Sequence, residues 1–425
     1  MLGAGPMGLA VAYQLIKDGH NPIVFESDDR VGGMAATFDF GDLEIERYYH
    51  FHCTSDTAFN EILKELGIHE LLKWVPTCMG YWYKDELHPW GTPWALLRFP
   101  GLGLVAKIRY GLHTFSSIKR NSWQKLDRKD AASWIRRWVG DRAFDVLWRD
   151  LFEYKFYHLA ENVSAAWIWS RIRRIGRSRS SIFREKLGYL DGGSSTLLNA
   201  MSQYINENGG EIRLNSRIQR VVVDDGSVIG VDVDGNFYAF EKVISTIPVA
   251  YLPQIISELP EKIKHMFASQ ENIAVVCVIA KLKKPVSKYF WINTNDHRMD
   301  IPGLVEYSNL RPLKESLVYV PFYLPRNHPT FSESDLEFQN KVIRYLKLIN
   351  NELLDDDFID IKVHRYKYAQ PICQPGHLDN LPPIALPIVG LWAADTSYYY
   401  PEDRGISESV AMGREIARSS TSTST

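Results

Sequence analysis

Three glycines close to the N-terminus have the spacing of a turn that binds phosphate. Gly3, Gly5 and Gly8 stand directly before a helix-forming run at residues 9–17. The first glycine of such a turn permits a tight bend, the second lets the backbone approach a phosphate, and the third lets the helix pack closely on a strand. The free N–H groups at the helix N-terminus then face the phosphate charge. The spacing therefore predicts a strand, a turn and a helix that hold a dinucleotide pyrophosphate.

An acidic residue and a second glycine turn follow this motif. Residues 22–25 are predicted to form a buried strand, and Glu26 comes directly after it. An acid about 20 residues beyond the glycines binds ribose hydroxyls, and it would repel a cofactor with a 2′-phosphate. Gly32 and Gly33 come shortly after Arg30 and form the second turn. The alternative for Glu26 is a solvated charge at a strand end, which the register of the glycines makes the weaker interpretation.

The strand that should precede the first turn is short. Only Met1 and Leu2 stand before Gly3, whereas a turn of this kind normally follows a whole buried strand. We therefore expect that the true start lies upstream or that the chain is a fragment.

The composition is that of a globular protein with room for two domains. The chain has 425 residues, of which 45% are hydrophobic and 24% are charged. Its formal net charge of −2 gives no reason to expect a nucleic-acid partner. The four cysteines are far apart, so we expect buried, reduced thiols in a cytoplasmic protein. His50 and His52 have no third ligand at a suitable spacing, so we predict no metal and place both in a polar pocket.

No apolar run in the sequence is long enough to cross a membrane. Residues 94–118 come nearest, because aliphatic and aromatic residues there alternate with Arg98, Lys107 and Arg109. Such a segment either makes a peripheral contact with the bilayer interface or forms a core helix whose cations reach solvent. We expect a cytoplasmic protein, with peripheral contact to the inner face of the membrane as the open alternative.

The predicted elements divide the chain into two interleaved domains. Residues 58–187 are predicted to be helical and hold ten of the twelve tryptophans, which indicates a layer with large apolar pockets. Alternating strands and helices resume after residue 188, and an antiparallel sheet with one amphipathic helix is predicted between residues 260 and 375. The Ser/Thr-only ending, residues 419–425, is predicted to be a disordered tail. The nucleotide domain is expected to comprise residues 1–57, 186–255 and 383–425, and the substrate domain residues 58–185 and 256–382.

Five arginines fall between residues 171 and 179. Such a run is usually a solvated face. Fixed guanidinium groups also bind phosphate or carboxylate groups, so an anionic substrate stays open as an alternative.

The order of these motifs resembles the flavin-containing amine oxidase superfamily, which includes protoporphyrinogen oxidases, phytoene-type desaturases and, more distantly, UDP-galactopyranose mutases. The resemblance rests on the first glycine turn, Glu26, residues 30–33, the glycine turn at 192–193 and Asp395. It covers nearly the whole nucleotide domain and is loose in the substrate domain. It implies an α/β fold with a Rossmann-like, glutathione-reductase-type FAD-binding domain that is discontinuous, and a second α+β substrate domain.

The resemblance implies FAD as the cofactor, bound non-covalently because no cysteine lies near residues 395–406. Arg30 and Gly33 would contact the pyrophosphate and ribityl region, and the backbone near Val221 the adenine. Asp395 would bind ribityl or pyrophosphate oxygens. The implied cofactor-binding residues are Gly3, Gly5, Pro6, Met7, Gly8, Glu26, Ser27, Arg30, Gly32, Gly33, Met34, Val221, Asp395, Gly405 and Ile406.

The last helix is predicted at residues 407–418, and the loop before this helix would face the flavin ring. Gly405 and Ile406 would present N–H groups to the pyrimidine edge, where the helix N-terminus would stabilise the negative charge of a reduced flavin. By their place in the motif or the pocket wall, the catalytic candidates are Tyr398, Tyr399, Arg404, Tyr366 and Tyr368. Each tyrosine has packing as its alternative role.

These inferences favour an FAD-dependent oxidoreductase that takes a hydride from a small-molecule substrate in an aromatic pocket, with oxygen or a quinone reoxidising the flavin. The first alternative is a UDP-galactopyranose mutase-like enzyme that acts on a sugar nucleotide or polysaccharide precursor, so that the substrate is anionic or glycosylated. The arginine run favours this alternative. The second alternative is a flavoprotein scaffold without turnover.

Overall fold

In the part of the chain that is predicted to be the nucleotide domain, a small parallel sheet joins strands that are far apart in the sequence. The computed structural model describes residues 1–181 and 184–421. In it, β1 (Ile23–Phe25) pairs with β9 (Glu211–Arg213), and β13 (Val243–Ser245) pairs with β19 (Leu391–Ala393). Leu2 joins the two pairs through parallel bridges to Phe25 and Ser245. The predicted central position next to the glycine turn is therefore filled by a single bridging residue.

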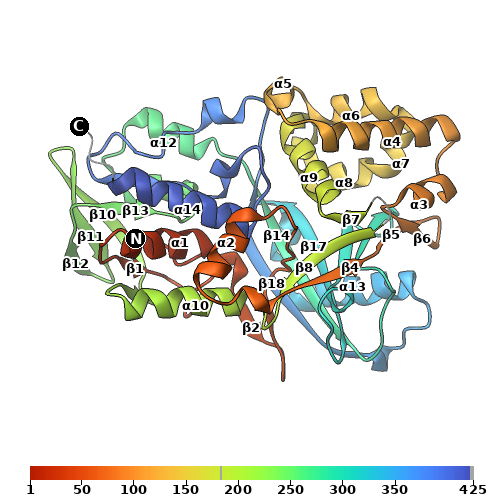
Figure 1. The fold of residues 1–425 in the computed structure, drawn as a ribbon, viewed down its shortest axis with the longest axis horizontal. Helices are drawn as coiled ribbons and strands as arrows, with labels where there is room; N and C mark the ends of the chain where they lie inside the picture. Colours follow the sequence, from red (N-terminus) through yellow and green to blue (C-terminus); the bar gives the residue numbers. More distant parts are fainter. Residues whose placement is uncertain (182–183, 422–425) are drawn as a thin grey trace.

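Helices cover this sheet, and a three-stranded antiparallel sheet completes the domain. Helix α1 (Pro6–Lys17) packs against both α10 (Ser194–Glu207) and α14 (Ile406–Thr421). Figure 1 shows α1 beside α14, which comes from the other end of the chain. The antiparallel sheet comprises β10 (Ile218–Asp224), β11 (Ser227–Val233) and β12 (Asn236–Ala239).

The predicted hairpin turn lies between β10 and β11. Asp225 and Gly226 both have positive φ, 42° and 73°, as a tight two-residue hairpin requires. The alternating α/β elements on both sides of a long interruption confirm the predicted fold class.

A seven-stranded sheet forms the floor of the second domain. Its strand order is β18-β14-β17-β16-β15-β5-β6. The pair β15–β5 is parallel and the other pairs are antiparallel. The strands are β5 (Met79–Tyr83), β6 (Glu86–Trp90), β14 (Asn272–Leu282), β15 (Trp291–Asn295), β16 (Gly303–Glu306), β17 (Ser316–Pro325) and β18 (Phe358–Pro371).

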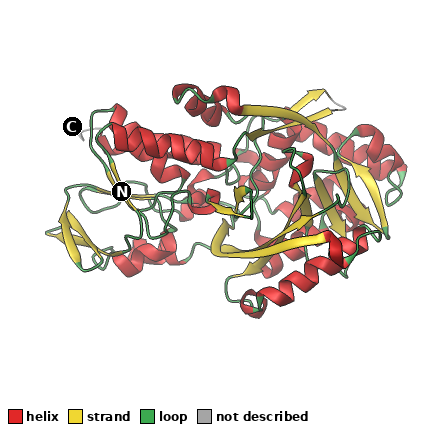
Figure 2. Ribbon diagram, turned by 90° about the horizontal axis from the view of Figure 1, so that it is seen from below, coloured by secondary structure: helices red, strands yellow, loops and turns green. Residues whose placement is uncertain are grey.

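The central strand β14 is buried on both faces, which explains its unbroken apolar sequence. Val276 and Val278 belong to the core beneath α13 (Asp335–Ile349). Val275 and Cys277 point the other way, into the core shared with the helical layer, because side chains alternate along a strand. Figure 2 shows helices on both sides of this sheet.

A layer of helices covers the face of the sheet that carries Val275 and Cys277. Helix α9 packs against α4, α5 and α6, and its Trp167 and Trp169 are fully buried. These two tryptophans therefore pack in the core of the layer. The layer comprises α3 (Pro93–Arg98), α4 (Leu104–Lys119), α5 (Gln124–Asp127), α6 (Ala131–Val139), α7 (Asp141–Leu147), α8 (Arg149–Phe156) and α9 (Ala165–Arg177).

The prediction that residues 58–187 are helical is wrong at both ends of that range. Strands β4 (Leu72–Thr77), β5 and β6 lie there, as do β7 (Arg179–Ser181) and the start of β8 (Arg184–Leu190). Strand β4 pairs with β8, and β5 pairs with β15, more than 100 residues away. Such partners leave no local signature in the sequence. In addition, α2 (Thr57–Glu65) packs against α14 and so lies on the nucleotide domain.

Two smaller predictions also need correction. Residues 419–421 belong to α14, with Ser420 buried, whereas a disordered tail was predicted there; residues 422–425 lie outside the described part. Cys78 is exposed, whereas the other three cysteines are buried as predicted. The remaining elements are β2 (Thr37–Asp39), β3 (Glu44–Glu46), α11 (Leu252–Ile255) and α12 (Glu261–Ala268).

Candidate active site

One continuous cavity of about 1680 Å³ joins the glycine turn to the helical layer. Ordinary ligand pockets measure about 300–1,000 Å³, so this cavity has room for a dinucleotide together with a second molecule. Its lining comes from the parallel sheet, the seven-stranded sheet and the helical layer. Segments that are far apart in the sequence therefore line one shared cavity.

The first glycine turn has the shape that a phosphate needs. A Cβ on Gly8 would lie 2.0 Å from the carbonyl oxygen of Gly3, so only glycine allows α1 to pack this close to the strand. A Cβ on Gly5 would meet nothing within 4 Å, because Gly5 faces the cavity at the N-terminus of α1. The open backbone at Gly5 fits a pyrophosphate cradle.

The second glycine turn closes on the first. Gly32 has φ 119° and donates its N–H to the carbonyl of Ala4 over 2.9 Å. A Cβ on Gly33 would lie 3.5 Å from Cα of Gly5. The two turns thus lie side by side in one wall of the cavity, where Gly5 and Gly33 leave the backbone accessible.

Glu26 is held at the edge of this cradle. Its Oε2 accepts from the N–H of Ala4 over 2.8 Å, and its Oε1 accepts from the N–H of Asp28 over 3.0 Å. Both contacts fix the carboxylate while Glu26 and Ser27 line the cavity. This placement fits a ribose-binding acid better than a solvated strand end.

Asp395 serves as a helix cap and lines the cavity as well. Its Oδ1 accepts from the N–H and hydroxyl of Ser397, at the start of η9 (Thr396–Tyr399). Its Oδ2 accepts from the N–H of Val249 over 2.9 Å. Burial raises the pKa of Asp395, and the hydrogen bonds from Ser397 and Val249 oppose that rise. Asp395 therefore pins two loops of the nucleotide domain together beside the cavity.

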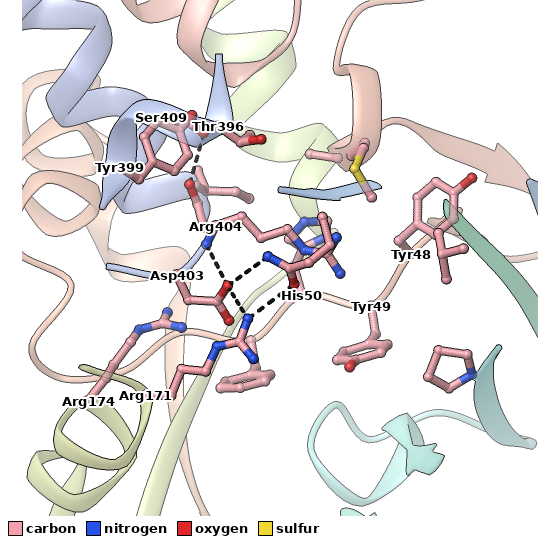
Figure 3. Close-up of a pocket in the computed structure, with 18 of the residues that line it drawn as sticks. Tyr48, Tyr49, His50, Arg171, Arg174, Thr396, Tyr399, Asp403, Arg404 and Ser409 are labelled. Atoms are coloured by element: carbon pink, nitrogen blue, oxygen red, sulfur yellow. Dashed lines mark hydrogen bonds and ion pairs between the residues drawn. The ribbon is translucent and has the colours of Figure 1, made fainter. Parts of the chain in front are cut away.

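The loop before α14 carries a polar cluster that joins three distant segments. Asp403 accepts from Arg171 of α9 over 2.7 Å and from Gln370 of β18 over 3.2 Å. Burial raises the pKa of Asp403, but Arg171, Lys155 and Arg404 outweigh it and hold that pKa well below its usual range. The guanidinium of Arg404 donates to the carbonyl of Ala369. Figure 3 shows this cluster under the N-terminus of α14.

Aromatic side chains form the walls around this cluster. Tyr48 and Tyr49 face the cavity (Figure 3), together with Tyr323, Tyr366 and Tyr368. Burial raises the pKa of Tyr49 and Tyr366, so their phenols stay protonated at neutral pH. The walls therefore supply flat apolar surfaces with neutral hydroxyls.

Both predicted histidines lie in the cavity wall and are neutral. Burial lowers the pKa of His50, and it lowers the pKa of His52 to about 3. The ring of His52 stacks on Phe59 at 3.6 Å. Among the described residues, no group of three His, Cys, Asp or Glu side chains is arranged to hold a metal ion.

The structure brings most of the sequence-predicted site residues to this one cavity. Those that line it are Gly3, Gly5, Pro6, Met7, Glu26, Ser27, Gly33, Met34, Asp395, Gly405, Ile406, Tyr399, Arg404, Tyr366 and Tyr368. The others are not part of the lining: Gly8, Arg30, Gly32, Val221 and Tyr398.

The reasons for these exceptions differ. Gly8 and Gly32 act through backbone packing. The guanidinium of Arg30 pairs with Asp29 at 2.7 Å and donates to the carbonyl of Thr37. Tyr398 donates its hydroxyl to the carbonyl of Pro382, and Val221 is buried in the core.

Some lining residues were not predicted. Arg217 lines the cavity just before β10, and residues 246–248 line it at the end of β13. The second group could have been found, because ligands of α/β sheets bind beyond the carboxyl ends of the strands. Lys155 also lines the cavity, and nothing in its local sequence marked it.

The cavity is strongly cationic. Ten lysine or arginine side chains line it against four acidic ones. From the arginine run, Arg171, Arg174, Arg177 and Arg179 belong to the lining and Arg173 does not. Arg174 makes a two-fold contact with the buried Asp56, at 2.7 and 3.1 Å. The positive excess favours a ligand with negative charge.

Comparison with known proteins agrees with this geometry. The model of the family described as flavin containing amine oxidoreductase matches residues 8–398. The 15-cis-phytoene desaturase of Capsicum annuum is 25% identical over 286 residues, which cover 61% of this chain and 48% of that protein. The chain thus spans about half the length of this curated relative.

Two solved structures show the same fold. An oxidoreductase from Methanosarcina mazei superposes with a TM-score of 0.74 at 18% identity, covering 98% of this chain and 99% of that one. Reduced UDP-galactopyranose mutase superposes with a TM-score of 0.74 at 16% identity, covering 98% and 93%. The family match confirms the resemblance inferred from the motifs, and with it a flavin as the cofactor. The chain belongs to the flavin-containing amine oxidoreductase family.

Proposed function

We propose that the protein is an FAD-dependent oxidoreductase that accepts a hydride from a C–H bond of a small-molecule substrate. The observation that carries this proposal is the single cavity that joins the glycine cradle and Glu26 to aromatic walls in the second domain. FAD, when bound, supplies the two-electron chemistry. We further propose residues 1–57, 186–255 and 383–425 as the domain that binds it.

The chain's own residues would contribute binding, orientation and electrostatics. The backbone at Gly5 and Gly33 would hold the pyrophosphate, with Glu26 on the ribose. The N-terminus of α14 at Ile406 would stabilise negative charge on the pyrimidine edge of the cofactor. The tyrosine walls would exclude water and orient a flat or apolar substrate.

The test begins with the purified protein. We expect a yellow flavin spectrum, and we expect the matching substrate to bleach it without oxygen and air to restore it. Gly5→Val would fill the open cradle and yield colourless protein, as would Asp395→Ala by releasing the loop that it pins. Stoichiometric FAD in both variants would contradict the site assignment. A yellow protein that no candidate substrate bleaches would favour the scaffold alternative.

A mutase-like reaction on a sugar nucleotide or polysaccharide precursor is the second candidate. The four arginines of the run that line the cavity favour it, since guanidinium groups bind diphosphates well. A mutase would convert its substrate only with reduced flavin and would leave the spectrum unchanged after turnover. Product that forms only after dithionite has reduced the flavin, with no further change in the flavin spectrum during turnover, would support the mutase-like reaction.

We also propose that α3 and α4 dock on an anionic bilayer surface. Their outward side chains are large and apolar, with Leu104 66% and Val105 72% exposed. The others are Trp94, Leu97, Ile108, Leu112 and Phe115. Between residues 91 and 126 the chain has six lysines or arginines and no acid. Apolar contact and basic charge together are typical of a monotopic membrane surface.

The opposite side of α4 supports this placement. Tyr110, Thr114 and Ile118 line the cavity, and Phe115 of the apolar surface lines it as well, so α4 alone lies between that surface and the site. A substrate dissolved in the bilayer would therefore have a short path inward. None of the helices in the described part of the chain combines the length and apolarity needed to cross a membrane.

Vesicle flotation tests this contact with a matched control. Val105 and Val389 are both 72% exposed, and Val389 lies on the nucleotide domain. We expect binding to phosphatidylglycerol vesicles and little to phosphatidylcholine vesicles, because each basic residue adds about 1 kcal/mol at an anionic surface. Val105→Asp should lose binding and Val389→Asp should keep it. Equal loss in both, or a stable dimer that buries α4, would refute bilayer docking.

A further inference from the structure

Lys155 is a cation without a partner in the cavity wall. It lies near the end of α8 and lines the cavity. Among the described residues, its Nζ has no hydrogen bond and no ion pair. The ammonium lies instead 4.8 Å from the ring centroid of Tyr323 and 5.9 Å from that of Phe156. The side chain is partly exposed, and it faces the cavity. A lysine charge that is held away from bulk water without a partner loses hydration without compensation.

The charged groups around Lys155 come from α9 and the loop before α14. They are Arg171 and Arg404, both positive, and Asp403, the only carboxylate among them. Asp403 is already engaged by Arg171 at 2.7 Å, by Gln370 and by the N–H of Arg404. The ring of Tyr323 completes the surroundings. Asp403 alone among these groups favours the charged form of Lys155, and it does so without a direct ion pair.

Burial lowers the pKa of Lys155 well below its ordinary value, and the positive charge of Arg171 adds to that effect. Asp403 opposes it and Arg404 reinforces it. Both effects favour the neutral amine, whose lone pair can accept a proton.

We propose that Nζ of Lys155 accepts the proton when the substrate is oxidised, an inference that rests on the proposed function. In an H–C–O–H or H–C–N–H substrate, the C–H bond breaks and its electron pair leaves with the hydrogen as hydride to the flavin. The O–H or N–H bond breaks, its electron pair forms the C=O or C=N bond, and its proton goes to Nζ. The substrate is thereby oxidised and the flavin reduced by two electrons.

This assignment names a substrate class. An amine base can take a proton from a hydroxyl or an amine as the hydride leaves, whereas an unactivated C–H bond is far too weak an acid. The protein would therefore act on an alcohol or amine carbon. Other bases in the cavity suit the task less well: burial lowers the pKa of His364 to about 4 and also lowers that of His50. A proton acceptor works best with a pKa near the working pH.

The first test measures the amine itself, apart from activity. The FAD-loaded protein is labelled with trace acetic anhydride between pH 5 and 11, and each lysine is quantified by mass spectrometry. Lys119 serves as the internal control, because it lines the cavity but is exposed. We expect the labelling midpoint of Lys155 at least two pH units below that of Lys119. Equal midpoints, or a Lys155 that never reacts, would overturn the proposal.

The second test compares Lys155→Met with Lys155→Arg. Both should retain FAD, and both should slow anaerobic flavin reduction about 10²–10⁴-fold, the usual contribution of a positioned base. The acid limb of the wild-type pH profile should vanish in both. Rescue by arginine would show that only the charge matters and would overturn the proposal. So would bleaching by substrates that lack O–H and N–H groups, an outcome that leaves the oxidoreductase proposal intact.

Discussion

At the scale of single residues, Gly8 shows how strictly the nucleotide cradle depends on backbone packing. A Cβ there would lie 2.0 Å from the Gly3 carbonyl oxygen, which is a backbone atom, so the strand end or the helix would have to shift. We expect Gly8→Ala to lower the free energy of unfolding by about 1–3 kcal/mol through overpacking, and to lower FAD content. Urea unfolding and the ratio of flavin to protein absorbance measure the two effects.

Gly111 provides the matched control for this change. It also lies inside a helix, α4, but a Cβ there would meet nothing within 4 Å. Gly111→Ala should therefore raise stability by up to about 1 kcal/mol through helix propensity alone. If Gly8→Ala proved as harmless as Gly111→Ala, the packing argument for the third glycine would fail.

Two buried carboxyl groups predict a pH dependence of stability. Burial raises the pKa of Glu185 and of Glu408 to about 7, while Arg179 and Arg174 respectively oppose it. The folded state then holds protons that the unfolded state releases near pH 4.5, so stability falls as pH rises from about 4.5 to 7. Each group would account for about 3 kcal/mol at 1.36 kcal/mol per pKa unit.

Glu408→Gln removes the pH-dependent contribution of Glu408 to stability, because glutamine stays neutral at every pH. Between pH 5 and pH 8, we expect the free energy of unfolding of the variant to rise by about 2–3 kcal/mol relative to that of the wild type. Chemical unfolding at both pH values gives the difference. A constant offset between variant and wild type would mean that Glu408 does not titrate in this range.

At the scale of elements, the sequence predicted those helices and strands whose formation depends on residues that are close together in the chain. The glycine spacing and the apolar run gave α1, and the Asp225-Gly226 turn gave the β10–β11 hairpin. Strands β5 and β6 were missed because β5 pairs with β15, far along the chain. Arg30 was placed at the pyrophosphate by resemblance, but its guanidinium bonds Asp29 one residue away. A motif fixes the backbone path better than the direction of a long side chain.

Helix α13 offers a prediction at this scale. Ser334 and Glu337 form a capping box at its N-terminus, and α13 covers the far face of the large sheet. We expect Ser334→Ala to lower the free energy of unfolding by about 1 kcal/mol, which is the usual contribution of such a cap. The cavity lies on the other face, so FAD content should not change. A loss of FAD with the cap would show that the two faces of the sheet are coupled.

At the scale of the whole molecule, the site exists only where distant segments meet. Arg171, Gln370 and Asp403 come from α9, β18 and the loop before α14, and their hydrogen bonds span 33 to 232 residues. The motifs predicted a role for individual segments, but they did not predict which side chains of these segments contact each other. Lys155 went unnoticed for the same reason, since Asp403 and Arg404 in its surroundings come from the other end of the chain.

This cluster predicts how Lys155 responds to its neighbours. Arg171→Met removes one positive charge and leaves Asp403 free to pair with the ammonium, so the acetylation midpoint of Lys155 should rise by at least one pH unit. Asp403→Asn removes the one carboxylate that, among the described residues, raises the pKa of Lys155, and it should lower the midpoint. Arg177 of the same helix instead bonds Asn121, so Arg177→Met is the control and should leave the midpoint unchanged. Shifts of the same sign in both cluster variants would mean that the cavity collapses rather than that charge sets the pKa.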